Sequence, residues 1–273
     1  MFGKLMKHEL RATARIIPLC WAAAAVITGL YLLVQKLDIV WLKSASVVFV
    51  VIAVIAVSIV AVAVVAMRFS QTMFGSESYL SHSLPVPSGK LLLSKALVGV
   101  LWIFCSVLIT LGGLLLILYP WYEALHELQS IVDMVLAWVR QVGFVPVVLG
   151  CIGLGLLSSM ESVAHIFTAI TLGNLPGNQK HALAFSVVFY LLINQVLSTV
   201  YGVLILLLPP ALRFSPEGVS LVLSVPIRTL MDTAQMGAVY FDYGITGIVI
   251  QYAADIALLF LVKRLLDKKL SVK

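Results

Sequence analysis

The sequence predicts an all-α polytopic membrane protein with six transmembrane helices, and three observations support this. Hydrophobic residues make up 62% of the 273 residues, charged residues make up 11%, and the mean hydropathy is +1.10. Soluble domains carry roughly 25% charged residues, so this chain cannot present a normal wetted surface. The apolar residues also fall in long runs, each long enough to cross a bilayer and bounded by charges or helix breakers.

The first 15 residues are too polar for the core of a signal peptide and too short to span a membrane. Their basic side chains form one helical stripe, with apolar side chains opposite, which predicts an amphipathic helix at the interface with its basic face toward lipid headgroups. The stripe consists of Lys4, Lys7, His8, Arg11 and Arg15. Glu9 lies on the apolar side, so we expect it to pair with a Lys or Arg elsewhere or with a partner protein. A basic flank that only sets orientation is the alternative.

Six membrane spans are expected along the chain. They lie near residues 16–35, 44–67, 92–119, 146–172, 182–208 and 244–262. An even number of spans places both termini on one side of the membrane. That side carries 13 of the 18 Lys and Arg, so the positive-inside rule makes it cytoplasmic. We therefore expect a multi-pass protein of the cell (plasma) membrane with both termini in the cytoplasm.

Residues 68–95, between the second and third spans, form one of the most polar stretches of the chain, RFSQTMFGSESYLSHSLPVPSGKLLLSK. Pro85 and Pro87 stop any preceding helix, and Ser76 can cap a short helical turn. We expect a short helix across the cytoplasmic face, at the place where a soluble protein would most readily bind. An ordinary solvated loop is the alternative.

Two outer segments, 120–141 and 209–243, connect later spans. The first has apolar residues at helical spacing, which predicts an external amphipathic helix over 122–141. The second mixes Pro, Gly and apolar runs that are too short to span. Such backbone is tolerated at membrane depth only where protein or water satisfies it, which favours a re-entrant or lid-like segment.

Motifs for catalysis are missing from the sequence. It contains no GxxxxGK[ST] phosphate-binding loop, no GxSxG nucleophile turn and no HExxH zinc motif. Any ATP hydrolysis must therefore take place on another chain, and we expect no catalytic, cofactor-binding or metal-binding residue here. Glu161 and His165 are four residues apart on one helical face, which suggests a metal site or a proton relay. Two ligands are fewer than the roughly three that a catalytic zinc takes from protein.

Polar side chains inside the predicted spans are the remaining candidates, because charges at membrane depth are costly and face a bundle interior or an aqueous cavity. They are Glu161, His165, Asn194, Gln195, Gln251 and Asp255. These residues either form interhelical hydrogen bonds or line a substrate path or subunit interface. Gly112 and Gly113, and likewise Gly150, Gly153 and Gly155, permit close helix approach, either within the chain or in a dimer.

The order of these features resembles the permease subunits of ABC-2-type ATP-binding-cassette exporters. The amphipathic FGKLMKHELRATAR is followed by two spans and then by FGSESYLSHSLPVPSGKLLLSKAL. In related permeases of bacterial peptide-export and antibiotic-export systems, the second stretch reads as an acidic residue, Tyr-Leu, Leu-Pro and a later Ser-Lys. The matching positions here are Glu77, Tyr79, Leu80, Leu84, Pro85, Ser94 and Lys95. FTAITLGNLPGNQKHALAF at 167–185 is similar to that family's short return loop, but departs from it in containing Pro176.

The resemblance implies that residues 1–273 form one transmembrane permease domain, with an interfacial helix at 1–15 and a cytoplasmic coupling loop at 68–91. A coupling helix would dock in a groove of a separate nucleotide-binding ATPase subunit, which would hold ATP and Mg. Its docking residues would be Ser76, Glu77, Ser78, Tyr79 and Leu80. A second permease subunit, identical or different, would complete the exporter, with membrane lipid as a further partner and no nucleic acid.

The cargo and the competing functions follow from the same residues. The spans contain no dense ring of charges such as an ion path favours, which points to an amphipathic or hydrophobic substrate such as a peptide, an antibiotic or a lipid-like molecule. Two other classes stay open. One is a non-transporting membrane scaffold or signalling protein, and the other is an intramembrane enzyme that uses Glu161, His165 and Asp255.

Overall fold

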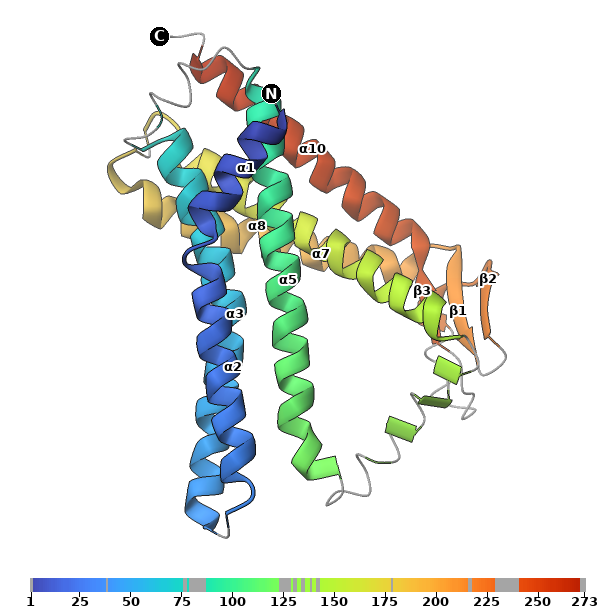
Figure 1. Cartoon of the computed structure of the whole chain (residues 1–273). Helices are drawn as coiled ribbons and strands as arrows, with labels where there is room; N and C mark the ends of the chain where they lie inside the picture. Colours follow the sequence, from blue (N-terminus) through green and yellow to red (C-terminus); the bar gives the residue numbers. More distant parts are fainter. Residues whose placement is uncertain are drawn as a thin grey trace. The chain divides into compact units, whose positions relative to one another are not determined.

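The computed structural model covers the whole chain and is built almost entirely of helices (Figure 1). It describes every residue except 1, 38, 76–77, 79–86, 123–128, 130–131, 134–135, 138, 141–142, 178, 216–217, 229–240 and 271–273. The helices are α1 (Phe2–Thr13), α2 (Ile17–Val34), α3 (Val40–Met73), α5 (Ser88–Tyr122), α7 (Phe144–Gly173), α8 (Ala182–Leu207) and α10 (Ile245–Leu270). A short 3₁₀ turn (Gln179–His181) precedes α8. Three strands, β1 (Ala211–Ser215), β2 (Gly218–Val222) and β3 (Phe241–Gly244), lie between α8 and α10.

Six of these helices, α2, α3, α5, α7, α8 and α10, are long and apolar enough to cross a membrane. The predicted class, an all-α polytopic membrane protein with six spans, is therefore confirmed. The helices on either side of the predicted 68–95 loop extend into it, because α3 ends only at Met73 and α5 already begins at Ser88. They have 34 and 35 residues, more than predicted. At 1.5 Å per residue each is about 50 Å long, well beyond the roughly 30 Å of a bilayer's hydrocarbon core.

Contacts within the chain divide it into two compact units. The first contains Met1–Val132, Ser158–Val163 and Leu270–Lys273, and the second contains Asp133–Leu157 and Ala164–Lys269. That the chain works as one permease domain stays a prediction.

In the first unit, α2 and α5 both pack along α3, and α1 packs against α5 (Figure 1). Tyr31, Val50, Val54 and Ile117 form a buried cluster where the three long helices meet. The Tyr31 hydroxyl donates a hydrogen bond of 2.9 Å to the carbonyl oxygen of Ile117, so this buried polar group is satisfied inside the bundle. This packing holds the three long helices together toward the end opposite the 68–95 loop.

In the second unit, a three-stranded antiparallel sheet of order β2-β1-β3 follows α8. The sequence predicted a re-entrant or lid-like segment over 209–243, and these strands were not expected. Their local signal is weak: residues 219–225 place serine at 220 and 224 between apolar side chains, but Val222 interrupts the alternation expected of a strand open to water on one side. An added Cβ at Gly247 would lie 2.6 Å from the backbone nitrogen of Ile205, so the start of α10 packs closely on α8.

The first outer segment is described only in pieces. Within the predicted 122–141 helix, Tyr122 and the described residues among 129–140 are helical. The other residues of this segment lie outside the described part of the chain. An amphipathic external helix over this segment therefore stays a prediction.

Candidate functional site at the base of the 68–95 loop

Helix α1 is amphipathic, as its sequence predicts. The basic side chains Lys4, Lys7, His8 and Arg11 are exposed, whereas Glu9 and Thr13 are buried at 8% and 4% exposure. Glu9 and Thr13 are four residues apart and therefore share one face of the helix. Residues of α1 contact α5 and, to a smaller extent, α3. The polar pair Glu9 and Thr13 thus belongs to the buried face, and the cations belong to the open one.

The buried carboxylate of Glu9 has two cationic partners. It accepts a hydrogen bond from Nζ of Lys95, and its second oxygen lies 3.6 Å from Nε of Arg68. The side chains of Glu9, Lys95 and Arg68 are 10%, 4% and 21% exposed. Buried charges are stable only when they are paired, so these contacts explain how an acid can occupy the apolar side of α1. The expectation that Glu9 pairs with a Lys or Arg is confirmed.

The three residues of this Glu9 cluster, Glu9, Arg68 and Lys95, come from three helices. Arg68 lies in the last turns of α3, and Lys95 lies near the start of α5. The loop therefore connects two helices that both pair with Glu9, α3 through Arg68 and α5 through Lys95. A force on the loop would act on two helices that share one counter-ion.

A second polar layer lies one helical turn further along α1. The hydroxyl oxygen of Thr13 accepts a hydrogen bond of 2.7 Å from Nε1 of Trp102, and that hydroxyl donates to the carbonyl of Glu9 at 2.9 Å. Trp102 packs on Trp21 of α2 with 5.4 Å between ring centroids, and Nε1 of Trp21 donates to Ser106 at 3.0 Å. Lys95 and Trp102 are seven residues apart on α5 and so lie on the same side of it. Helix α1 is thus held on α5 at two levels.

Most of the predicted docking residues lie outside the described part of the chain. Ser76, Glu77, Tyr79 and Leu80 are not among the described residues, and neither are Leu84 and Pro85. Ser78 is described, and its N–H donates to the carbonyl of Gly75 at 3.1 Å. The later positions of the same stretch, Ser94 and Lys95, are both buried at the start of α5. The coupling helix therefore stays a prediction, whereas the helices that carry the loop are described.

Among the intramembrane candidates, the structure brings His165 together with Asp255. Nε2 of His165 on α7 lies 3.3 Å from Oδ1 of Asp255 on α10, and the two side chains are 1% and 0% exposed. The sequence placed His165 on one helical face with Glu161, and Glu161 is half-buried one turn earlier on α7. Nothing in the local pattern identifies Asp255 as the partner, because the pair joins two separate helices.

The other polar candidates occupy less enclosed positions. Asn194 and Gln195 on α8 are exposed, and the Gln195 amide donates to Thr199 at 3.3 Å. Gln251 on α10 is half-buried. Within the part of the chain that the structure describes, His, Cys, Asp and Glu side chains form no group of three or more that could hold a metal ion.

Sequence reasoning missed an ion pair in the sheet. Arg213 of β1 binds Asp242 of β3 through two parallel hydrogen bonds, Nε to Oδ1 at 2.8 Å and Nη2 to Oδ2 at 2.9 Å. The Ser224 hydroxyl donates to the same carboxylate. Arg213 and Asp242 are direct cross-strand partners, so the pair fastens the two strands to each other. The segment 209–243 contains two arginines, Arg213 and Arg228, and several acids, and no local pattern tells which of them pair.

Comparisons of the chain with protein-family models, with curated proteins and with solved structures found no match. The class that the fold defines is an all-α, multi-pass membrane protein with six helices able to cross a membrane.

Proposed function

We propose that this chain is the membrane-spanning permease subunit of an ABC-2-type exporter, and that a separate nucleotide-binding ATPase docks on its 68–95 loop. The observation that carries the proposal is the Glu9 cluster, in which one carboxylate binds a cation from each helix that the loop connects. A partner that presses on this loop would move α1, α3 and α5 together. Such coupling is what an ATP-driven permease needs.

The energetics of the cluster support a positional role. Burying charges costs several kcal/mol per ion, and apolar side chains of similar size often stabilise a protein as well or better. A buried ion pair is therefore weak evidence for stability alone. Its location at the base of the polar 68–95 stretch favours a part in fixing the relative positions of α1, α3 and α5.

The lengths of α3 and α5 support access by a soluble partner. Because each helix is about 50 Å long, an end of each extends beyond the hydrocarbon core. Arg68 and the polar residues that follow it come after the apolar segment of α3, so a polar end of this helix is next to the loop. With the loop at the cytoplasmic face, an ATPase could reach it without entering the membrane.

The exporter would need further components. ATP and Mg would bind the ATPase, because this chain lacks a phosphate-binding loop. A second permease subunit would complete the transporter in the plasma membrane, with both termini of this chain in the cytoplasm. None of the most apolar window of α8 is buried within the chain, which leaves surface for lipid or that subunit. An amphipathic or hydrophobic cargo suits such apolar spans.

The intramembrane-enzyme alternative has less support. Its candidate His165 and Asp255 are 1% and 0% exposed and face each other, so a substrate would have to displace one from the other. The alternative of a scaffold without transport is tested by the purification described next, because recovery of the chain without an ATPase would favour it.

The test is affinity purification of the full-length chain from its native membrane in mild detergent, with mass spectrometry and an ATPase assay. We expect a soluble ATP-binding subunit in near-equal amount. The double variant Tyr79→Ala/Leu80→Ala should lose this subunit while still inserting into the membrane. Leu223→Ala, the same type of truncation at a residue that is 86% exposed in the outer segment, should keep it. Recovery of the chain alone in several detergents, or unchanged recovery with the double variant, would contradict the proposal.

A further inference from the structure

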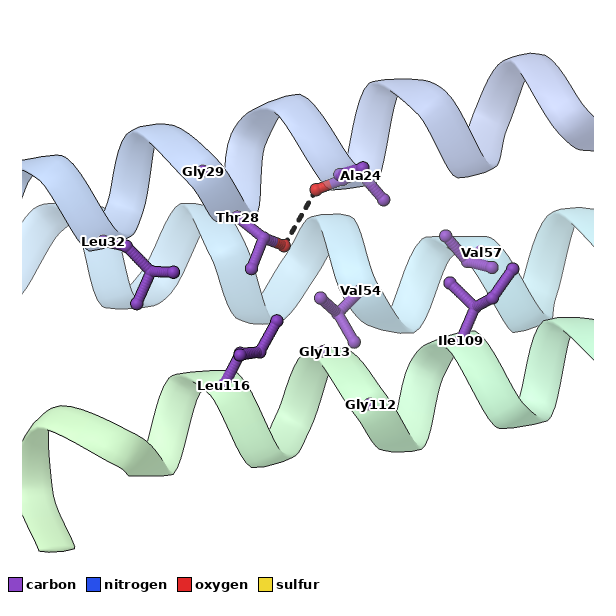
Figure 2. A pocket seen from close by; sticks show the side chains of 11 residues that line it. Ala24, Thr28, Gly29, Leu32, Val54, Val57, Ile109, Gly112, Gly113 and Leu116 are labelled. Atoms are coloured by element: carbon purple, nitrogen blue, oxygen red, sulfur yellow. Dashed lines mark hydrogen bonds between the residues drawn. The ribbon is translucent and has the colours of Figure 1, made fainter.

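The first unit contains a cavity of about 340 Å³ between α2, α3 and α5. Figure 2 shows α3 between the other two helices in this view, with the lining side chains Val54 and Val57 on α3 and Leu116 and Ile109 on α5. Val54 and Val57 are each 2% exposed, whereas Ile109 and Leu116 are 36% and 47% exposed. The cavity thus has a closed floor and opens at the outer surface of the helices.

The wall of the cavity is chemically uniform. All 11 lining residues are aliphatic, glycine or threonine. The threonine, Thr28, uses its hydroxyl hydrogen within its own helix, where it donates to the carbonyl of Ala24 at 2.8 Å (Figure 2). Water needs two to four polar partners to occupy a cavity, and this wall does not supply them. The chemistry therefore selects a hydrocarbon.

Two of the lining residues are glycines with open space beside them. An added Cβ at Gly29 of α2 or at Gly112 of α5 would meet nothing within 4 Å. The neighbouring Gly113 is different, because its added Cβ would lie 2.8 Å from Cγ2 of Val54. Helix α5 therefore packs tightly on α3 at Gly113, and the empty space lies beside this contact, along Gly29 and Gly112.

The surroundings of the opening identify the occupant. The helices that form the cavity are three of the six able to cross a membrane. Exposed leucines are next to the lining residues in the sequence, namely Leu30 at 56%, Leu111 at 53% and Leu115 at 69%. Such a surface at membrane depth meets lipid hydrocarbon, and the cavity is continuous with it. An empty cavity would also forfeit the dispersion contacts of its lining.

We infer that this cavity, the Gly29–Gly112 slot, binds one acyl chain of a membrane phospholipid. An apolar cavity of about 150 Å³ accepts benzene, so the slot has room for a longer run of methylene groups. A chain in the slot has helices on three sides, whereas a chain on the ordinary lipid-facing surface contacts protein on one. The inference does not depend on the proposed transport function.

The experiment uses the purified full-length chain in phosphatidylethanolamine and phosphatidylglycerol vesicles that contain a phospholipid with a photoreactive diazirine in its acyl chain. After illumination, labelled peptides are mapped by mass spectrometry. We expect label concentrated on 24–32 and 109–116, above the level on the lipid-exposed residues around Leu149 of α7, which is 63% exposed. Label spread evenly over all apolar helices would show ordinary surrounding lipid and overturn the inference.

Variants give the second test. Gly29→Leu and Gly112→Leu place a side chain in open space, so the protein should fold and the slot label should fall to the level of the surrounding surface. Gly150→Leu is the control, because its added Cβ also meets nothing within 4 Å but lies on α7. Ile109→Ala widens the slot and should keep or increase the slot label. This variant tests the inference even if a leucine variant fails to fold, because loss of the label from a widened slot would contradict it. Unchanged slot label in both leucine variants would overturn the inference.

Discussion

The carboxylate of Glu9 accepts a hydrogen bond from Nζ of Lys95, a residue 86 positions later in the chain. This bond ties the N-terminal helix to α5, and the nearby guanidinium of Arg68 ties it to α3. The helices on both sides of the 68–95 loop consequently share one carboxylate. If the loop receives a partner, α1 is part of the structure that the partner moves.

Replacing Lys95 with Met tests this bond. The change removes one charge and leaves a buried carboxylate with the more distant Arg68, so we expect a loss of about 3–5 kcal/mol in stability. The measurement is thermal unfolding in detergent, followed by tryptophan fluorescence, to which Trp102, hydrogen-bonded to Thr13 one turn from Glu9, contributes. Lys7→Met is the control. It removes an exposed cation from α1 and should leave the unfolding temperature unchanged.

The double variant Glu9→Gln/Lys95→Met removes both charges and should recover part of the lost stability, because no unpaired carboxylate remains. If Lys95→Met unfolds at the same temperature as the unmodified chain, the bond contributes nothing and Glu9 is not held as described. If Lys95→Met unfolds at a lower temperature but still co-purifies with the ATP-binding subunit in full amount, the cluster only stabilises the fold. The proposed coupling of α1, α3 and α5 to the partner would then be wrong.

The two adjacent glycines of α5 should respond in opposite ways to alanine. At Gly113 the new methyl group would meet Val54, whose branched side chain has little freedom to move, so we expect a loss of about 1–3 kcal/mol. At Gly112 it would meet open space, and alanine's higher helix propensity should be neutral or stabilising by up to about 1 kcal/mol. Thermal unfolding of the two variants side by side is the measurement. Equal effects would contradict the packing of α5 on α3.

The same glycines show how much of the helix packing could be predicted from the sequence. Their spacing indicated close helix approach but could not tell internal packing from dimerisation, because a sequence does not show which neighbour faces which residue. The six spans were predictable because each one needs only its own apolar run. The anomaly of Glu9 was visible too, since a helical pattern marks an acid on the wrong face. Its partner Lys95 was not identified, because that contact depends on how α1 lies across α5.

Long-range pairing also explains what was missed in the second unit. Residues 211–215 and 218–222 are short enough to read as loop, and they form strands through their pairing with each other and with β3. His165 was interpreted with Glu161 because local periodicity relates residues on one helix only. Its partner in the fold, Asp255, lies on another helix.

The bidentate pair in the sheet should control the stability of that sheet. Arg213→Met leaves the fully buried Asp242 carboxylate without its guanidinium, so we expect a local loss of up to about 3–5 kcal/mol. Hydrogen–deuterium exchange should become faster at residues 211–222, while α8 keeps its protection. Arg228→Met removes an exposed arginine from the same segment and should leave the exchange unchanged. Unaltered exchange after Arg213→Met would mean that strand pairing alone holds the sheet.

A double-mutant cycle on His165 and Asp255 measures whether the buried pair acts as a unit. Single changes to alanine each leave the partner buried at the interface of α7 and α10, whereas the double change removes both polar groups. Groups in direct contact couple by about 0.5–3 kcal/mol, so the double variant should be more stable than the sum of the single losses allows. The measurement is the midpoint of thermal unfolding for all four proteins in the same detergent. A parallel cycle of His165→Ala with Gln195→Ala, where Gln195 is exposed on α8, should be additive. Additivity in both cycles would mean that the 3.3 Å approach of His165 to Asp255 carries no interaction energy, and these two residues would then be only neighbours in the core of the second unit.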